Sequence, residues 1–214
     1  MKTTIIIFFL CLLSPVFLQA QNKDGGAIQL LDEISQKYIR YSSIQIDYTY
    51  KAEKEKKVLD SYKGKMEIKG KKYYLTIPGQ TFYCDGETIW NYQKESNEIS
   101  IFEYDDEDES IMNPVQLLID WQKNYRAKFI REEFENNKTV ALVDITPIKQ
   151  ESYFRIRLYI DKLKNEILRF AIYEKDNTIY TYYFDKFTPN VPIDDQKFKL
   201  DLKDYPNADV NDMR

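Results

Sequence analysis

Few residues in this sequence could support catalysis or hold a metal ion. It contains no histidine and two cysteines, Cys11 and Cys84. Zinc sites draw on cysteine and histidine, and Ser–His or Cys–His catalysis needs an imidazole, so these chemistries are excluded. The acidic run at residues 105–109 lacks the glycine and the spaced ligands of a calcium loop. We therefore expect no catalytic residue, no metal site and no cofactor.

Residues 1–20 have the pattern of a cleaved secretory signal peptide. Lys2 supplies a short positive region, residues 3–16 are almost wholly apolar, and a small residue closes the segment. Roughly a dozen apolar residues are too few to span a bilayer, which needs ~20 in a helix. Lipidation of Cys11 is the alternative, but large side chains precede this cysteine where small ones are required. We expect secretion and a single mature domain over residues 21–214.

The composition of the mature domain limits its partners. Without Lys2, 30 of the 31 basic residues remain against 35 acidic ones, a net charge of −5. The lysines are scattered among acids rather than gathered in a patch, so no nucleic-acid partner is expected. Cys84 is then the single cysteine, which excludes an internal disulfide, and we expect it to be a packed small residue rather than a reactive thiol. We expect a monomer.

Hydrophobic periodicity divides the mature chain into helical and extended segments. Leu31, Ile34, Tyr38 and Tyr41 recur at helical spacing, which predicts an amphipathic helix over residues 27–41. The period then changes to two, which is typical of half-buried strands. The expected strands lie at residues 44–50, 62–69, 73–77, 81–84, 88–92, 99–101, 127–134, 139–146, 154–161, 167–173 and 179–187, with a short final strand near Phe198.

A second helix is expected between the sixth and seventh strands. Asn113 and Pro114 offer an N-cap followed by a proline at the first helical position. Leu118 and Ile119 lie on the apolar stripe of this helix and are candidates for a lid. Short turns such as Asp85-Gly86 favour antiparallel pairing. The pattern predicts an α+β fold in which a large curved antiparallel sheet forms an unclosed β-barrel, with helices as a lid over an apolar cavity.

Residues that alternate with polar ones along the strands are the candidates for the wall of this cavity. Ordinary core packing is the alternative for each of them. The candidates are Ile44, Ile46, Tyr48, Tyr50, Met66, Ile68, Trp90, Tyr92, Phe154, Ile156, Leu158 and Ile160.

Several local motifs, in this order, resemble the LolA-like outer-membrane lipoprotein carriers. Residues 83–92 (YCDGETIWNY) look like the family's Asp-Gly-x-Thr-aromatic strand pair, and residues 64–69 (GKMEIK) fit its early hairpin. Asn113-Pro114 fits the inserted lid helix, and residues 198–200 lie where a final strand is expected. The resemblance covers residues 27–203. It implies a periplasmic half-barrel that takes acylated lipoproteins from an inner-membrane releasing complex to an outer-membrane acceptor.

One departure from the family pattern concerns the lid. The family often has an Arg-Pro just after the early hairpin strand, and the resemblance implies that this arginine holds the lid closed. Here Gly70, Lys71 and Lys72 occupy that stretch. Lys71 or Lys72 is the candidate replacement, although lysine lacks the forked guanidinium group of arginine.

The sequence favours a periplasmic carrier that binds the acyl chains of lipoproteins and is not an enzyme. The alternatives are a carrier of another lipid or glycolipid in an envelope biosynthetic pathway, and a sensor or scaffold that binds protein partners on the same fold. A hydrolase that pairs Asp47 or Asp144 with a glutamate is a further, weaker hypothesis.

Overall fold

One large sheet dominates the computed structural model, which describes residues 23–105, 119 and 121–214. Its first six strands are β1 (Ile44–Lys54), β2 (Lys57–Lys69), β3 (Lys72–Ile77), β4 (Gln80–Cys84), β5 (Thr88–Gln93) and β6 (Glu98–Glu103). The others are β7 (Tyr125–Glu135), β8 (Lys138–Pro147), β9 (Tyr153–Asp161), β10 (Glu166–Glu174), β11 (Thr178–Pro189) and β12 (Asp209–Asp212). The helical elements are α1 (Lys23–Ile39), α3 (Trp121–Asn124) and two short 3-10 helices, η1 (Asp195–Phe198) and η2 (Leu202–Asp204).

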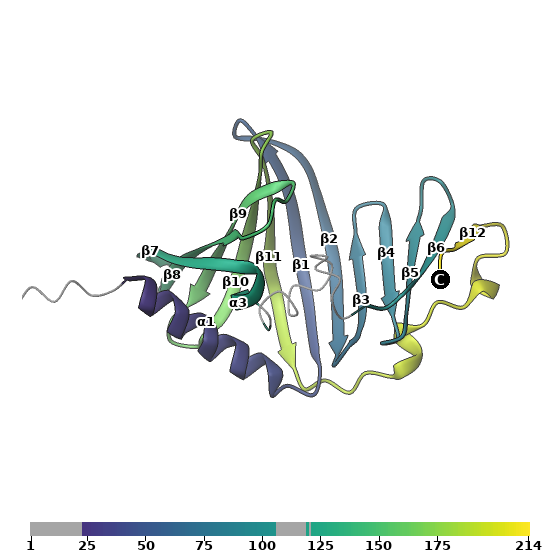
Figure 1. The fold of residues 1–214 in the computed structure, drawn as a ribbon, viewed down its shortest axis with the longest axis horizontal. Coiled ribbons are helices and arrows are strands. Elements are labelled where there is room, and N and C mark those ends of the chain that lie inside the picture. The colour runs from purple at the N-terminus through teal and green to yellow at the C-terminus, as the bar shows by residue number, and fades with distance from the viewer. Residues whose placement is uncertain (1–22, 106–118, 120) are drawn as a thin grey trace, which may run out of the picture.

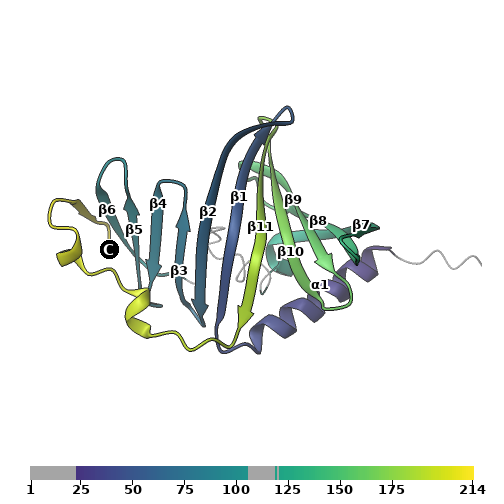
Figure 2. The ribbon, with the colours of Figure 1, turned by 180° about the vertical axis from the view of Figure 1, so that it is seen from behind.

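The sheet consists of two antiparallel meanders joined at its centre. Its strand order is β12-β6-β5-β4-β3-β2-β1-β11-β10-β9-β8-β7. The two meanders meet where β1 pairs with β11, with Ile46 opposite Phe187 and Tyr50 opposite Tyr182. The sheet is curved, but its edge strands β7 and β12 do not pair with each other. It therefore does not close into a barrel (Figures 1 and 2). The predicted unclosed sheet with few helices is confirmed.

The two faces of the sheet carry two separate apolar clusters. We call the face that α1 covers the inner face and its large cluster the main cluster; it includes Leu31, Ile46, Leu75 and Ile156. A smaller second cluster forms on the outer face around Ile99, Ile101 and Leu200. The chain that follows β11 supplies Leu200, so the C-terminal segment covers this part of the outer face.

Helix α1 is fastened to the sheet by one apolar stripe and by polar contacts at its C-terminal half. Leu31, Ile34 and Tyr38 are buried in the main cluster, which confirms the predicted amphipathic face. The Lys37 ammonium lies 3.0 Å from the Glu166 carboxylate, and the Tyr38 hydroxyl accepts a hydrogen bond from the Ile167 amide at 3.3 Å. Both partners belong to β10, so α1 is held against the second meander (Figure 1).

The C-terminal segment differs from the prediction. No strand forms at Phe198; this residue ends η1, is fully buried and follows an N-cap in which the Asp194 carboxylate accepts from the Gln196 amide at 3.0 Å. The last strand is β12, which pairs with β6 in parallel, so the sheet is mixed rather than wholly antiparallel. An aspartate N-cap favours a helical turn over an extended chain, which explains why the short apolar run did not become a strand.

Several expected elements fall partly outside the described residues. These are the signal peptide at 1–20, most of the acidic loop at 105–109 and the start of the second helix at 113–118. Helix α1 begins at Lys23, four residues earlier than predicted, and ends at Ile39. Within the described part of the chain, no helix has both the length and the apolar character needed to cross a membrane.

Candidate lipid-binding face

Most of the predicted wall residues lie on the inner face, where they are buried in the main cluster. Period-two alternation turns every second side chain of a strand toward the inner face. Each of these residues has less than a tenth of its surface exposed. This set is Ile44, Ile46, Tyr48, Met66, Ile68, Ile156, Leu158 and Ile160. Tyr50 is half-buried and packs against the same cluster. That these residues contact a lipid stays a prediction.

Phe154 does not lie with them. Tyr173 of β10 pairs with Arg155, and Glu174 pairs with Tyr153, so Phe154 is the extra residue of a bulge. A bulge shifts the alternation by one residue, so Tyr153 takes the inner position and Phe154 turns outward. Phe154 is 46% exposed, and its ring centroid lies 6.2 Å from that of Tyr173. The prediction that Phe154 faces inward with Ile156 is therefore wrong.

Trp90 and Tyr92 also lie on the face opposite to the predicted one. Their strand neighbour Ile89 belongs to the main cluster, whereas Trp90 and Tyr92 pack against the second cluster. The Tyr92 ring lies 4.5 Å from the ring of Tyr205 in the C-terminal segment. Alternation separates two faces but does not say which one is covered by a later segment. The inner position on β5 is held by Ile89.

A close approach between three strands shapes the middle of the inner face. The ring of Tyr48 lies over Gly64 of β2, and its hydroxyl donates to the Thr76 carbonyl oxygen of β3. A Cβ atom on Gly64 would lie 2.3 Å from the Tyr48 ring and 2.7 Å from the Thr76 carbonyl oxygen. Glycine is therefore required at this position. The Thr76 hydroxyl accepts from the Lys65 amide at 2.9 Å, which continues the pairing of β2 with β3 through a side chain.

Several aromatic side chains on the inner face remain partly exposed and were not among the predicted residues. Tyr180, Tyr182 and Phe184 alternate along β11, and the Tyr182 ring stacks on Phe170 with 4.7 Å between centroids. Their period-two spacing is visible in the sequence. Tyr183, which lies between Tyr182 and Phe184, is also aromatic, so the alternation of apolar and polar residues is not clear there. The partly buried aromatic residues around the main cluster that were not predicted include Phe129, Tyr180, Tyr182, Phe184 and Phe187.

Of the two predicted lid residues, Leu118 lies outside the described residues. Ile119 is half-buried against the main cluster. Together with Trp121 it borders a groove of about 410 Å³ between α1 and α3, where the Gln122 amide donates to the Asp32 carboxylate at 2.7 Å. The described end of the second helix is therefore packed on α1 and on the apolar interior.

The two candidates for the lid-holding cation have different partners. The Lys72 ammonium lies 2.6 Å from the Asp195 carboxylate, which also pairs with Lys69 at 2.8 Å. Lys72 therefore holds the C-terminal segment. The Lys71 ammonium lies 5.7 Å from the ring centroid of Tyr104, which packs against the main cluster. Lys71 is thus the candidate that faces the inner side of the sheet.

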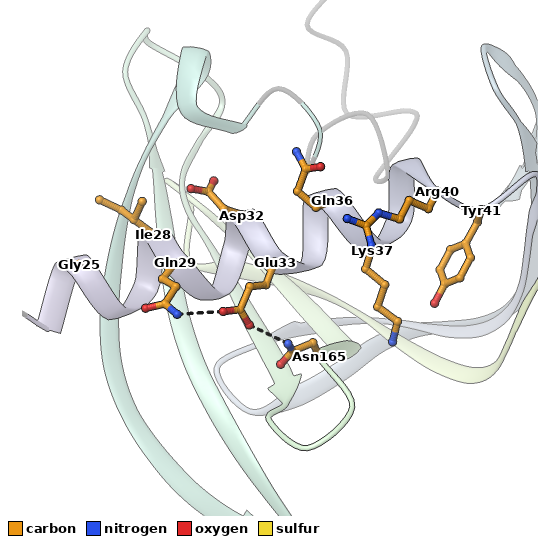
Figure 3. Close-up of a pocket in the computed structure, with 10 residues that line it drawn as sticks. All are labelled: Gly25, Ile28, Gln29, Asp32, Glu33, Gln36, Lys37, Arg40, Tyr41 and Asn165. Atoms are coloured by element: carbon orange, nitrogen blue, oxygen red, sulfur yellow. Dashed lines mark hydrogen bonds between the residues drawn. The ribbon is translucent and has the colours of Figure 1, made fainter.

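A second groove, of about 780 Å³, follows the exposed side of α1, and most of the side chains that line it are polar or charged (Figure 3). The Glu33 carboxylate connects side chains along this groove. It accepts hydrogen bonds from the Gln29 side-chain amide at 2.9 Å and from the Asn165 side-chain amide at 2.8 Å. Lys37 and Arg40 line the same groove.

The described residues give little support for a metal site or for a reactive thiol. They contain no group of three or more cysteine, histidine or acidic side chains placed to hold a metal ion. The Cys84 side chain is fully buried, and burial raises the pKa of its thiol to about 11. The thiol therefore stays protonated at neutral pH and is a poor nucleophile.

Comparison with known proteins decides the family. The model of the family described as "Outer membrane lipoprotein carrier protein LolA" matches residues 40–201. The chain belongs to the LolA family. The match covers the sheet from the end of α1 to the loop before η2, so the resemblance seen in the sequence is confirmed. The comparison with curated proteins finds no match.

Solved structures are similar to this chain at low sequence identity. An uncharacterized conserved protein from Thermus thermophilus is 10% identical, with 86% of this chain and 98% of that chain covered and a TM-score of 0.57. A LolA superfamily protein from Nitrosomonas europaea is 12% identical, with 81% and 97% covered and a TM-score of 0.44. A putative outer membrane lipoprotein-sorting protein domain from Vibrio parahaemolyticus is 11% identical, with 82% and 97% covered and a TM-score of 0.44.

Proposed function

We propose that this LolA-family protein carries the acyl chains of lipoproteins through the periplasm, from the inner to the outer membrane. One observation supports this most directly. The inner face of an unclosed sheet combines a continuous apolar cluster with partly exposed aromatic rings, among them Phe129, Phe184 and Phe187. Exposed aromatic surface bordering an apolar interior is the usual character of a site for an apolar ligand.

The energetics of acyl-chain binding fit an open sheet better than a closed barrel. Burying one methylene group contributes ~0.8 kcal/mol, so a fully buried 16-carbon chain gives on the order of 10 kcal/mol. A carrier that buried several chains completely could not release them without an energy source or a tighter acceptor. A half-open sheet leaves part of each chain in contact with water, and this lowers the free energy that release requires.

We further propose that the protein has no catalytic activity and acts in the periplasm. LolA-fold proteins are carrier or binding proteins rather than enzymes, and members of the family are periplasmic. The secretory pattern of residues 1–20 supports export of this chain. An inner-membrane releasing complex and an outer-membrane acceptor are the partners that such a carrier needs.

Native mass spectrometry of the protein purified from its host envelope tests this function. We expect a triacylated peptide bound one-to-one. Free glycolipid as the ligand would instead support the alternative of a lipid carrier in a biosynthetic pathway. A lipid-free protein that also fails to bind apolar dyes would contradict both.

A pair of substitutions locates the binding face. Phe184→Glu places a charge on the inner face and should abolish lipid recovery. Leu163→Glu makes the same kind of change at a turn where the side chain is 93% exposed, and it should leave lipid recovery unchanged. Circular dichroism of both variants checks that they are folded. Lipid recovery that is equal in the two folded variants would contradict binding at this face.

A further inference from the structure

On the inner face, Tyr50 of β1 contacts two tyrosines of β11, Tyr180 and Tyr182. The Tyr50 ring centroid lies 5.9 Å from that of Tyr180 and 5.2 Å from that of Tyr182. We call these three residues the tyrosine patch. They lie toward the hairpin ends of β1 and β11, whereas α1 crosses the opposite ends of these strands (Figure 1). All three are partly exposed, so the patch forms an open part of the inner face.

The hydroxyl groups of the tyrosine patch have no hydrogen-bond partner in the part of the chain that the structure describes. Other tyrosines on this face do have one. The Tyr48 hydroxyl donates to the Thr76 carbonyl oxygen, and the Tyr38 hydroxyl accepts from the Ile167 amide. The fully packed part of the inner face thus satisfies its phenols within the protein, and the open part leaves them to water or to a ligand.

A ligand that covers the patch must replace this water. Each phenol that loses its hydrogen bond without replacement weakens binding, so a purely apolar chain binds poorly there. A ligand with ester, amide or hydroxyl oxygens regains these bonds. Burial raises the pKa of Tyr50 to about 12, with the charge of Asp60 contributing, and burial also raises the pKa of Tyr182. The hydroxyls are therefore hydrogen-bond donors at neutral pH.

The charges around the patch favour a neutral ligand group. Among the described residues, Asp60 interacts electrostatically with Tyr50, and Lys54 interacts with Tyr180. The Lys54 ammonium is paired with the Asp176 carboxylate at 2.8 Å. These three side chains together carry a net charge of −1. Among the described residues that interact with the patch, the one cation is already paired, so a phosphate or a carboxylate placed there would meet this negative charge.

We propose that the tyrosine patch binds the neutral, oxygen-rich part of an acylated ligand, such as a glyceryl ester, while the acyl chain lies along the rest of the inner face. This inference rests on the proposed carrier function and adds a specificity to it. The protein would select acylglycerol-type groups over free fatty acids and over lipids whose only polar group is anionic.

Displacement of a fluorescent apolar dye from the full-length mature protein tests this specificity. The probes are monolauroylglycerol, laurate and dodecyl phosphate, which share a 12-carbon chain. We expect the glycerol ester to bind about tenfold more tightly than either anion. Tyr50→Phe and Tyr182→Phe each remove one hydroxyl and should weaken glycerol-ester binding about fivefold while changing laurate binding less than twofold.

One control variant and three contrary outcomes complete the test. Tyr205→Phe removes a phenol on the outer face and should leave all three affinities unchanged. Equal affinities for the three probes, or equal losses for all of them in the phenylalanine variants, would overturn the inference but keep the carrier function. If the dye and all three probes fail to bind the wild type, both the inference and the carrier function are lost.

Discussion

At the scale of single residues, Gly64 and Tyr48 govern how β2 and β3 meet beneath the inner face. Tyr48 is 1% exposed although it carries a hydroxyl group, because its ring crosses β2 at the one residue without a side chain. Its hydroxyl then reaches the Thr76 carbonyl oxygen of β3. A single glycine thus allows one aromatic ring to connect three strands.

We expect Gly64→Ala to destabilise the protein by about 2–3 kcal/mol, because the added methyl group meets both an aromatic ring and a backbone oxygen. Gly26→Ala is the matched control, since nothing lies within 4 Å of a Cβ atom at this helical position. There the change should be neutral or stabilising by up to about 1 kcal/mol. Urea unfolding measures both free energies. Similar values for the two variants would contradict the role given to Gly64.

At the scale of elements, ion pairs hold the C-terminal segment on the outer face of the first meander. Lys69 and Lys72 flank Asp195 of η1, and Lys199 lies 3.4 Å from Asp85 at the β4–β5 turn. The two lysines lower the pKa of Asp195 from 3.8 to about 2. Asp195 and its two lysines are accessible to water, so salt should weaken this attachment.

The lowered pKa makes the attachment of η1 dependent on pH. A carboxylate with a depressed pKa stabilises the folded state fully above pH 3.8 and loses this contribution as the pH falls toward about 2. Wild-type protein should therefore be more stable than Asp195→Asn at pH 6, and the difference should vanish near pH 2. Urea unfolding of both proteins across this range provides the measurement. A difference that stays constant with pH would show that Asp195 does not titrate through these ion pairs.

The periodicity of the sequence predicts the face that a side chain occupies only where the strand is regular. Ile156, Leu158 and Ile160 lie inward as their alternation predicts, because β9 is regular there. Phe154 breaks the pattern at a bulge whose cause is the pairing with β10, a contact that the local sequence does not contain. Phe198 was expected in a strand, but the Asp194 N-cap favours η1.

At the scale of the whole molecule, the sheet buries apolar side chains on both faces. Helix α1 covers the inner face of the second meander, and the C-terminal segment covers the outer face of the first (Figures 1 and 2). A curved sheet with two differently covered faces needs no closure to protect its core. Among the described residues, Tyr50, Tyr182 and Phe184 stay partly exposed on the inner face.

Removal of residues 202–214 should uncover the second cluster without unfolding the main one. In a Trp121→Phe background, the fluorescence of Trp90 should shift to the red, since the truncation removes Tyr205 from this cluster. In a Trp90→Phe background, the emission of Trp121, which is 4% exposed in the main cluster, should not change. Red shifts in both backgrounds would indicate global unfolding and contradict the independence of the two clusters.

The sequence by itself determined the absence of histidine chemistry, the amphipathic helix, the alternating strands and the family resemblance, because these depend on composition and local period. Only the tertiary structure decided which face each residue occupies. Trp90 and Tyr92 alternate as well as Ile46 does, yet they lie beneath the C-terminal segment. Alternation defines two faces but not their coverings, since a covering segment is supplied by chain distant in sequence.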